Sequence, residues 1–410
     1  MKYISRWRDR KFRDYAPAHP FFASTPAHQI CMFRYVVDFR GHLKFIEPMR
    51  LASFFVSLSV FIVATTVLGT VRAPLNPFSQ GKEGSVYDIR FPIREIVRLK
   101  LEHARETDRY DVGLFGNSRS DMVGRAEFGL SECKFFNYSA RGESIRNSLG
   151  LLEYLAAQGK APRIALISFD HMELAMIANA TSLPFRKHLE IAFRDLTFVT
   201  TSSDISVRDT ARLAFRYISG VWRSLKSAFS SDWLLEAAGR ILRGSLAPFS
   251  DSSNTADGYR SDGSFVIRKK KNNSPPPFKP AAGNEFIDAL LVHDLSQFKA
   301  LEGKGDRRVE KIIIYESPLS PPFDQRFAQF PRPQTAAHRQ AYLDACRSLE
   351  LTCFAAPRPN SVNSDKNVWR DASHPPAADL ARYLRRLIDD SGGCNSVAIS
   401  SIKAHGSDSP

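Results

Sequence analysis

The chain has 410 residues, of which 43% are hydrophobic, so it has ample material for a buried core and for two or three structural units. Its net charge of +14 would permit binding to nucleic acid, but the excess is dispersed and no zinc-finger, basic-zipper or RNA-module signature accompanies it. A membrane surface or an anionic polymer explains the charge equally well, and we expect no nucleic-acid partner.

The five cysteines show no Cys-x-x-Cys spacing and no pairing with histidine, which excludes a typical zinc site and a dense disulfide framework. Cys346 and Cys353 lie close enough in sequence to form a disulfide. We nevertheless expect two separate buried thiols. No metal ion is expected.

The N-terminal part of the chain has the pattern of a membrane anchor. Residues 1–50 carry ten Lys and Arg against four acidic residues and show no persistent periodicity, which predicts a mobile tail. Residues 51–71 contain no charge and are long enough to cross about 30 Å of hydrocarbon. A core helix would normally show a polar stripe, and a cleavable signal would rarely begin fifty residues into a chain. The positive-inside rule then places the tail in the cytoplasm and everything after Arg72 outside.

Alternating helical and strand patterns follow the anchor. An amphipathic helix is predicted over 91–106, strands over 112–115, 134–139 and 163–169, and a helix over 145–158. After a less regular stretch, helices are predicted near 285–301, 335–349 and 377–388, with strands at 309–315 and 351–355. Continuous apolar strands that alternate with helices are typical of a parallel sheet covered on both faces.

The irregular stretch has two components. Residues 207–246 are helix-rich and basic, and they are either an insertion that packs on the core or an amphipathic face for a membrane or an anionic chain. Residues 250–263 and 272–283 are predicted to be mobile loops. The resulting map has a tail (1–50), a transmembrane helix (51–71), a juxtamembrane segment (72–107), an α/β domain in two parts (108–186 and 285–390), a helical and loop insertion (187–284) and a disordered tail (391–410).

Ser118 is the candidate nucleophile. It lies in a small-residue turn directly after the predicted strand 112–115, where open α/β folds place their chemistry. A serine hydroxyl needs a base within hydrogen-bond reach, and the base needs a partner that fixes its tautomer. Asp371 and His374, three residues apart before the last helix, offer both, if the sheet brings the two ends of the domain to the same edge. Ser118 Oγ and His374 Nε2 should then lie near 3 Å apart.

These segments, in this order, resemble the SGNH (GDSL-like) hydrolase superfamily. More narrowly, they are similar to its membrane-anchored extracytoplasmic branch, which is related to alginate O-acetylation proteins and to the D-alanyl-transfer protein of teichoic acid synthesis. Residues 116–119 (Gly-Asn-Ser-Arg) stand where the family has Gly-Asp-Ser, residues 137–142 resemble the second block, and residues 371–374 (Asp-Ala-Ser-His) match the last block. The resemblance covers roughly residues 108–185 and 309–390.

The resemblance implies a three-layer α/β/α sandwich with a mostly parallel, flavodoxin-like sheet. It also implies Ser118 as nucleophile, His374 as base, Asp371 as orienter of the imidazole, and a backbone N–H of Gly142 in the oxyanion hole. The third block departs, because residues 168–171 read Ser-Phe-Asp-His where the family has Gly-x-Asn-Asp, so the usual asparagine donor is replaced. The residues that could compensate are Asn117, Arg119 and Asn147.

The expected function is that of a serine esterase or O-acyltransferase acting on a cell-surface polysaccharide or another acylated carbohydrate. The expected location is the bacterial cytoplasmic membrane, with the domain in the periplasm. No cofactor is needed for this chemistry, and acyl transfer would require a membrane-bound acyltransferase as partner. The alternative, favoured by the altered third block and the basic insertion, is a non-catalytic glycan-binding or assembly protein of the cell envelope with the same fold.

Overall fold

The computed structural model describes residues 76–80, 86–87, 93–129, 133–169, 185–201, 257–266, 285–303, 307–318, 333–356 and 374–393, together with residues 57, 207–208, 210–211, 214–215, 218 and 305. Apart from residue 57, the described residues belong to the unit that spans residues 69–410. The predicted tail 1–50, the predicted tail 391–410 beyond residue 393 and, apart from residue 57, the predicted membrane segment 51–71 lie outside this description. Across the described helices, none combines the length and the apolar character needed to cross a membrane.

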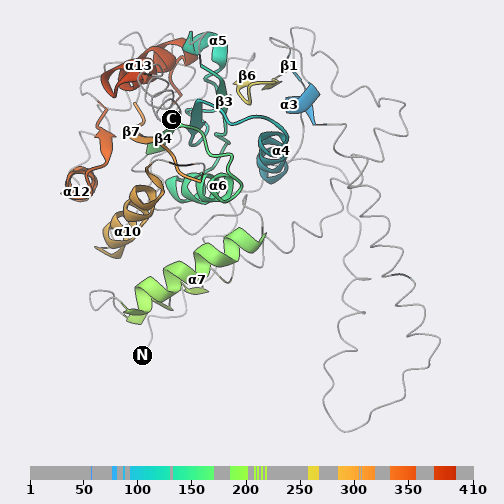
Figure 1. Ribbon diagram of the computed structural model, residues 1–410. Helices are drawn as coiled ribbons and strands as arrows, with labels where there is room; N and C mark the ends of the chain where they lie inside the picture. Colours follow the sequence, from blue (N-terminus) through green and yellow to red (C-terminus); the bar gives the residue numbers. More distant parts are fainter. Residues whose placement is uncertain are drawn as a thin grey trace, which may run out of the picture. The chain divides into compact units, whose positions relative to one another are not determined.

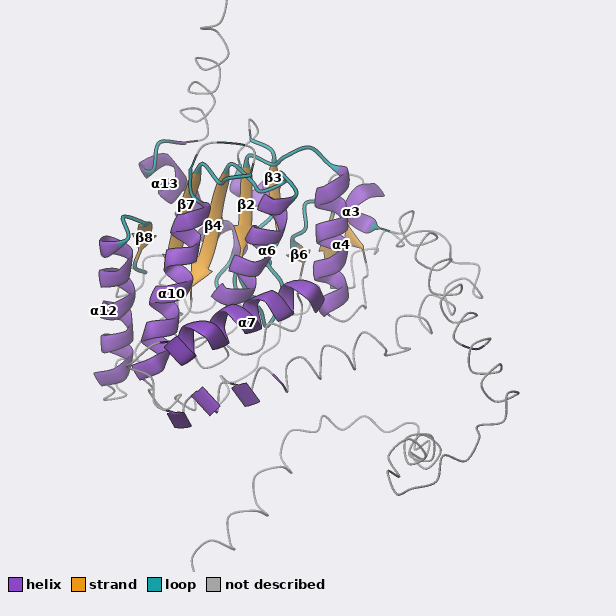
Figure 2. Ribbon diagram, turned by 60° about the horizontal axis from the view of Figure 1, so that its bottom comes forward, coloured by secondary structure: helices purple, strands orange, loops and turns teal. Residues whose placement is uncertain are grey.

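A five-stranded parallel sheet forms the centre of the domain. Its strands are β2 (Val112–Phe115), β3 (Phe135–Asn137), β4 (Ile164–Phe169), β7 (Lys311–Glu316) and β8 (Thr352–Phe354), and each neighbouring pair is parallel. The spatial order is β3-β2-β4-β7-β8. The second strand in sequence therefore lies outside the first, an order found in doubly wound α/β sheets. Figure 2 shows the strands side by side behind a layer of helices.

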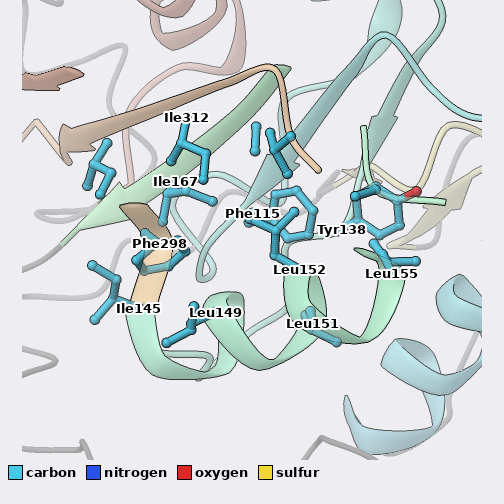
Figure 3. Packing of buried hydrophobic residues seen from close by; sticks show 14 of the residues in the cluster. Phe115, Tyr138, Ile145, Leu149, Leu151, Leu152, Leu155, Ile167, Phe298 and Ile312 are labelled. Atoms are coloured by element: carbon cyan, nitrogen blue, oxygen red, sulfur yellow. The ribbon is translucent and has the colours of Figure 1, made fainter. Parts of the chain in front are cut away.

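Alternate strand residues are buried against opposite helix layers. On one face, Phe115, Ile167 and Ile312 pack in a single cluster with Leu149 and Leu152 (Figure 3). The helices on this face are α4 (Ile93–Glu106), α6 (Ile145–Ala157), α10 (Glu285–Leu301) and α12 (Pro333–Ser348).

The other face is covered by α5 (Arg125–Phe128) and α13 (Ala377–Asp390), which contact each other. In Figure 1 both helices lie on the far side of the sheet from α6 and α10. Leu114, Leu166 and Ile313 pack there against Leu380 and Leu384. Because strand residues point alternately to opposite faces, an unbroken apolar strand requires a helix layer on each side, and the three-layer α/β arrangement follows.

Helix α7 (Phe185–Thr201) lies outside α6 and is held by a buried ionic triad. Arg146 of α6 contacts Asp195 of α7 at 2.6 Å and Asp294 of α10 at 3.0 Å, and all three side chains are fully buried. Burial raises the pKa of Asp294, and the Arg146 guanidinium opposes that shift. The amino-terminal part of the predicted insertion therefore docks on the α/β core.

A small antiparallel sheet flanks the main one. It contains β1 (Val86–Tyr87), β5 (Gly258–Arg260) and β6 (Phe265–Val266), and the short helix α3 (Pro77–Gln80) packs on α4 nearby. The prediction of a mobile loop over residues 250–263 is wrong for Gly258–Arg260. Residues 261–263 close a hairpin there, since the Arg260 N–H donates to the Ser264 carbonyl and the Gly263 N–H donates to the Arg260 carbonyl. Gly263 adopts φ +81°, the left-handed conformation found at the last position of such three-residue turns.

The prediction of two separate thiols at Cys346 and Cys353 is also wrong, because the structure joins them in a disulfide. The reason is the tight turn between α12 and β8. The Leu351 N–H donates to the Cys346 carbonyl at 2.9 Å, and the two cysteine Cα atoms lie 6.1 Å apart. This separation is within the range that a disulfide spans.

Candidate active site

The turn after β2 presents Ser118 at the carboxyl edge of the sheet. The Asn117 carbonyl accepts hydrogen bonds from the N–H groups of Ser120 and Asp121, each at 3.1 Å, and the Asn117 side-chain oxygen accepts from the Arg119 N–H at 2.8 Å. Within residues 112–121, Ser118 is the one residue that is not fully buried. The turn is thus closed by its own hydrogen bonds, and Ser118 is its half-buried residue.

The position of this turn in the topology is that of a ligand site. Strand β2 lies between β3 and β4 in the sheet. The connection that leaves β2 leads to β3 on one side of it, and the connection that leaves β3 crosses back to β4 on the other side. Open α/β sheets bind ligands outside the carboxyl ends of the strands at such a switch point. Ser118 follows β2 at this point.

The structure brings Ser118 and His374 together across 256 positions of sequence. The His374 Nε2 and Ser118 Oγ atoms are 2.8 Å apart, within hydrogen-bond reach. His374 lies just before α13, whose apolar side is anchored on the sheet by Leu380 and Leu384, and the imidazole is half-buried. With the proton on Nδ1, Nε2 can accept the Ser118 hydroxyl proton.

Three of the residues that sequence analysis discussed lie outside the described residues. They are Asp371, the predicted orienter of His374, and the pair Asp170 and His171 after β4. The third member of the triad, Asp371, therefore remains a prediction. Ser168, the first residue of the altered block, is buried in β4, and its hydroxyl lies 2.6 Å from that of Ser317.

The turn after β3 supplies the second set of predicted residues. Gly142 is exposed there with φ +73°, and nothing lies within 4 Å of a Cβ built on it. The Ala140 N–H donates to the Gly116 carbonyl at 3.0 Å, which holds this turn against the one that carries Ser118. In the part of the chain that the structure describes, the N–H groups of Ser118 and Gly142 donate no hydrogen bond, so both are available to a ligand oxygen.

The remaining predicted residues are buried around these turns. The Asn117 side-chain oxygen is engaged within its own turn, and Arg119 is buried beside it. Asn147 lies in the first turn of α6, where its N–H donates to the capping Ser144 hydroxyl at 3.4 Å. Their positions give Asn117 a role in shaping the turn, while Arg119 and Asn147 stay candidates for ligand contact.

Sequence analysis missed the hairpin β5–β6 as part of the site. The Phe265 N–H donates to the Asp121 carbonyl at 2.6 Å, and the Asn137 N–H donates to the Asp262 carbonyl at 2.8 Å. The hairpin therefore holds the turn after β2 at Asp121 and the end of β3 at Asn137. The signal that could have revealed it is Asp262-Gly263 between two short segments with aromatic residues.

Arg141 extends from the second turn toward this hairpin. Its guanidinium carbon lies 3.8 Å from the centroid of the Phe265 ring, and its Nε lies 3.6 Å from the buried Asp121 carboxylate. These contacts fix a half-exposed cation beside the candidate site. Over the described residues, no group of three or more His, Cys, Asp or Glu could hold a metal ion.

Comparison of the chain with models of protein families gave no match, and neither the curated proteins nor the solved structures gave one.

Proposed function

We propose that this protein is a serine esterase or O-acyltransferase that acts on an acylated cell-surface glycan. The observation that carries the proposal is the 2.8 Å separation of Ser118 Oγ and His374 Nε2 at the switch point of a parallel sheet. A serine hydroxyl within hydrogen-bond reach of an imidazole, on a residue that is only half-buried, is the minimal arrangement for covalent acyl transfer.

The first half of the reaction uses the groups on these two turns. Ser118 Oγ attacks the acyl carbonyl carbon while its proton passes to His374 Nε2. The carbonyl oxygen gains negative charge, which the free N–H groups of Ser118 and Gly142 would stabilise. His374 then returns the proton to the leaving alcohol oxygen as the C–O bond breaks, and the acyl group stays on Ser118 as an ester.

The second half releases the acyl group. Water or a sugar hydroxyl attacks the Ser118 ester, His374 takes the proton of the attacking group, and Ser118 Oγ leaves and recovers a proton from His374. Attack by water gives hydrolysis, whereas attack by a sugar hydroxyl gives transfer. Asp371 would orient His374 through its Nδ1–H in both halves.

The proposal includes an extracytoplasmic location, with residues 51–71 as a membrane anchor and the N-terminus in the cytoplasm. The Cys346–Cys353 disulfide supports this location, because structural disulfides persist in oxidising compartments such as the periplasm. Transfer would then draw its acyl group from a membrane-bound acyltransferase partner. The finer fold assignment, to the SGNH-type sandwich, is supported by the strand order β3-β2-β4-β7-β8.

One sequence observation favours a second candidate function. Asp170 stands where the similar hydrolases have the asparagine that donates to the oxyanion, and loss of one such donor costs about two to three orders of magnitude in rate. A protein with this change could bind acylated glycans without turnover. The residues of the two turns would then serve recognition.

Hydrolysis of 4-nitrophenyl acetate by the purified full chain separates the two candidates. We expect Ser118→Ala to reduce the rate by about 1000-fold or more, and we expect one acetyl group to be trapped on Ser118 in the wild type by rapid acid quench and mass spectrometry. Because Ser118 and His374 act as a unit, Ser118→Ala combined with His374→Gln should be no slower than either alone.

Ser348→Ala is the matched control, since the Ser348 hydroxyl bonds only the Ala345 carbonyl at the end of α12 among the described residues. It should hydrolyse the ester at the wild-type rate. Equal background rates in the wild type and Ser118→Ala, with no acetylated Ser118, would remove the enzyme proposal and leave the binding function.

A further inference from the structure

A buried lysine lies directly beneath the candidate site. Lys100 of α4 is 1% exposed, and its Nζ donates to the Ser139 carbonyl at 2.6 Å. The ammonium also lies 5.3 Å from the centroid of the Tyr259 ring. Burial of an ammonium group is costly unless it is paired and hydrogen-bonded, so this lysine holds a specific partner rather than filling space in an apolar helix face.

The carbonyl that accepts from Lys100 belongs to a peptide unit that makes a second hydrogen bond through its N–H group. The Ser139 carbonyl that accepts from Lys100 and the Ala140 N–H belong to the same planar peptide unit. That N–H donates to the Gly116 carbonyl at 3.0 Å. A single rigid peptide therefore connects Lys100 to the first residue of the turn that carries Ser118.

Gly116 itself is packed closely against its neighbours. A Cβ built on it would lie 2.4 Å from the Ser168 Cβ and 2.5 Å from the Ser120 Oγ, and its φ is +155°. The turn is thus pressed against β4 on one side and held by the Ser139–Ala140 peptide on the other. A displacement of that peptide would be passed on to Ser118, two residues later.

We infer that Lys100 is a positioning residue, which fixes the turn carrying Ser118 through the Ser139–Ala140 peptide without contacting the substrate. The inference rests on the proposed function of Ser118 for its catalytic consequence. A charged donor suits this task, because a hydrogen bond from an ammonium group to a carbonyl is stronger than a neutral one. It also polarises the peptide, which strengthens the bond that the Ala140 N–H makes to Gly116.

The charges that face Lys100 come from three segments. They are Asp121 in the turn after β2, Glu143 in the turn after β3 and Asp262 in the hairpin, and each favours the charged ammonium. Burial outweighs them and lowers the pKa of Lys100 to about 7, while burial raises that of Tyr259, which stays neutral. The charged donor is therefore present below about pH 7 and is lost as the pH rises, so the attachment weakens with increasing pH.

Hydrogen exchange of the full chain tests the attachment without relying on turnover. In Lys100→Met, exchange in peptides covering residues 116–121 and 138–143 should accelerate about tenfold or more, while peptides from α13 keep their rates. Lys160→Met is the matched control. Lys160 lies in the segment that leads into β4, and its Nζ donates to the Thr107 carbonyl at the same distance of 2.6 Å. It should leave both site peptides unchanged, and unchanged site peptides in Lys100→Met would overturn the inference.

Ester hydrolysis tests the catalytic consequence. Lys100→Met should lower kcat by up to about 100-fold with little change in KM, since a small misplacement of a catalytic group has an effect of this size. The wild-type kcat should also fall above about pH 7 in a way that Lys100→Met does not, which a purely structural role would not produce. A normal kcat or an unchanged pH profile in Lys100→Met would contradict the inference.

If Lys100→Met does not fold, the wild type still decides. Its site peptides should exchange faster on going from about pH 6 to about pH 8, after correction for the intrinsic rate, and the absence of such a change would overturn the inference. If the wild type and Ser118→Ala hydrolyse esters equally slowly, the proposed function fails, whereas the exchange rates still determine whether Lys100 anchors the two turns.

Discussion

Gly116 and Ser168 approach each other so closely that only glycine fits at position 116. An ideal Cβ on Gly116 would lie 2.4 Å from the Ser168 Cβ, a distance that real side chains do not show. Ser168 itself is held by the 2.6 Å contact of its hydroxyl with that of Ser317, the residue that follows β7. The carboxyl ends of β2, β4 and β7 thus lie together at Gly116, the first residue of the turn that carries Ser118.

The Gly116→Ala substitution should therefore damage both stability and the site. We expect a loss of about 2–3 kcal/mol in the free energy of unfolding, because the methyl group forces a backbone shift at a positive φ. Urea denaturation measures the loss. Gly303→Ala provides the control, since Gly303 has φ +145° but nothing within 4 Å of a Cβ. Equal losses in the two variants would show that φ, and not crowding by Ser168, determines the effect.

The buried triad of Arg146, Asp195 and Asp294 should respond strongly to removal of its cation. Arg146→Met removes the cation that contacts both buried carboxylates, although Arg194 stays 3.7 Å from Asp195, and we expect a loss of about 3–5 kcal/mol in urea denaturation. The triple variant with Asp195→Asn and Asp294→Asn should recover much of this loss. Arg347→Met removes an exposed ion pair with Asp344 and should change stability by less than about 1 kcal/mol. A comparable loss in the triple variant would mean that packing, not uncompensated charge, is responsible.

His103 predicts a specific dependence of stability on pH. Burial lowers its pKa to about 4 in the folded protein, and its Nε2 lies 2.7 Å from the Tyr110 hydroxyl. Between pH 4 and 6.5 the unfolded chain binds the proton that the folded chain excludes, so this contribution is complete above about pH 6.5 and is lost as the pH falls. The loss should amount to about 3 kcal/mol at most. His103→Gln should reduce the dependence over this range in urea denaturation, and an unaltered slope would show that other groups produce it.

The disulfide between Cys346 and Cys353 should contribute to stability in oxidising conditions. It closes a loop with a sequence separation of seven, for which restriction of the unfolded chain predicts about 2 kcal/mol. The double variant Cys346→Ser, Cys353→Ser should unfold at correspondingly lower urea concentration. Dithiothreitol should lower the stability of the wild type by more than that of the double variant, because only the wild type has this linkage to lose. No difference between the oxidised wild type and the double variant would show that the turn alone holds α12 against β8.

The main sheet was predictable because its strands are apolar on both faces. The strand predicted at 112–115 is confirmed as β2, and the helix predicted at 285–301 is confirmed as α10. The predicted strands at 134–139, 163–169, 309–315 and 351–355 correspond to β3, β4, β7 and β8, with ends that differ by up to two residues. Strands β2, β3, β4 and β7 are buried on both faces, so each is a short, mostly apolar run that the sequence pattern reveals.

The flanking elements were harder to predict because their signals are not local. Strand β1 has two residues and pairs with β5 more than 170 positions away, so no periodicity could show it. The helix α7 carries a fully buried Asp195, whose partners are Arg146 of α6 and the neighbouring Arg194. A polar residue whose charge is compensated only in the folded protein weakens the apolar pattern from which helices are predicted.

In the candidate site, the two residues Ser118 and His374 could be predicted from the sequence, whereas the residue Lys100, which holds the neighbouring turn, could not. The pairing of Ser118 with His374 followed from their order along the chain, and the structure brings these two side chains together. Lys100 carried no such signal, because a lysine in an amphipathic helix is normally exposed. Only the packing of α4 under the turn after β3 shows that its ammonium group is buried.

The 256 positions between Ser118 and His374 have a consequence for the order of events during synthesis. The chain has passed through all five strands of the sheet before residue 374 emerges, and α13, which covers the second face together with α5, comes after it. A growing chain can therefore form the nucleophile turn, and even most of the sheet, without a competent site. Under the proposed function, acyl chemistry would become available only when α13 docks, so any activity in a preparation would report molecules that have completed their fold.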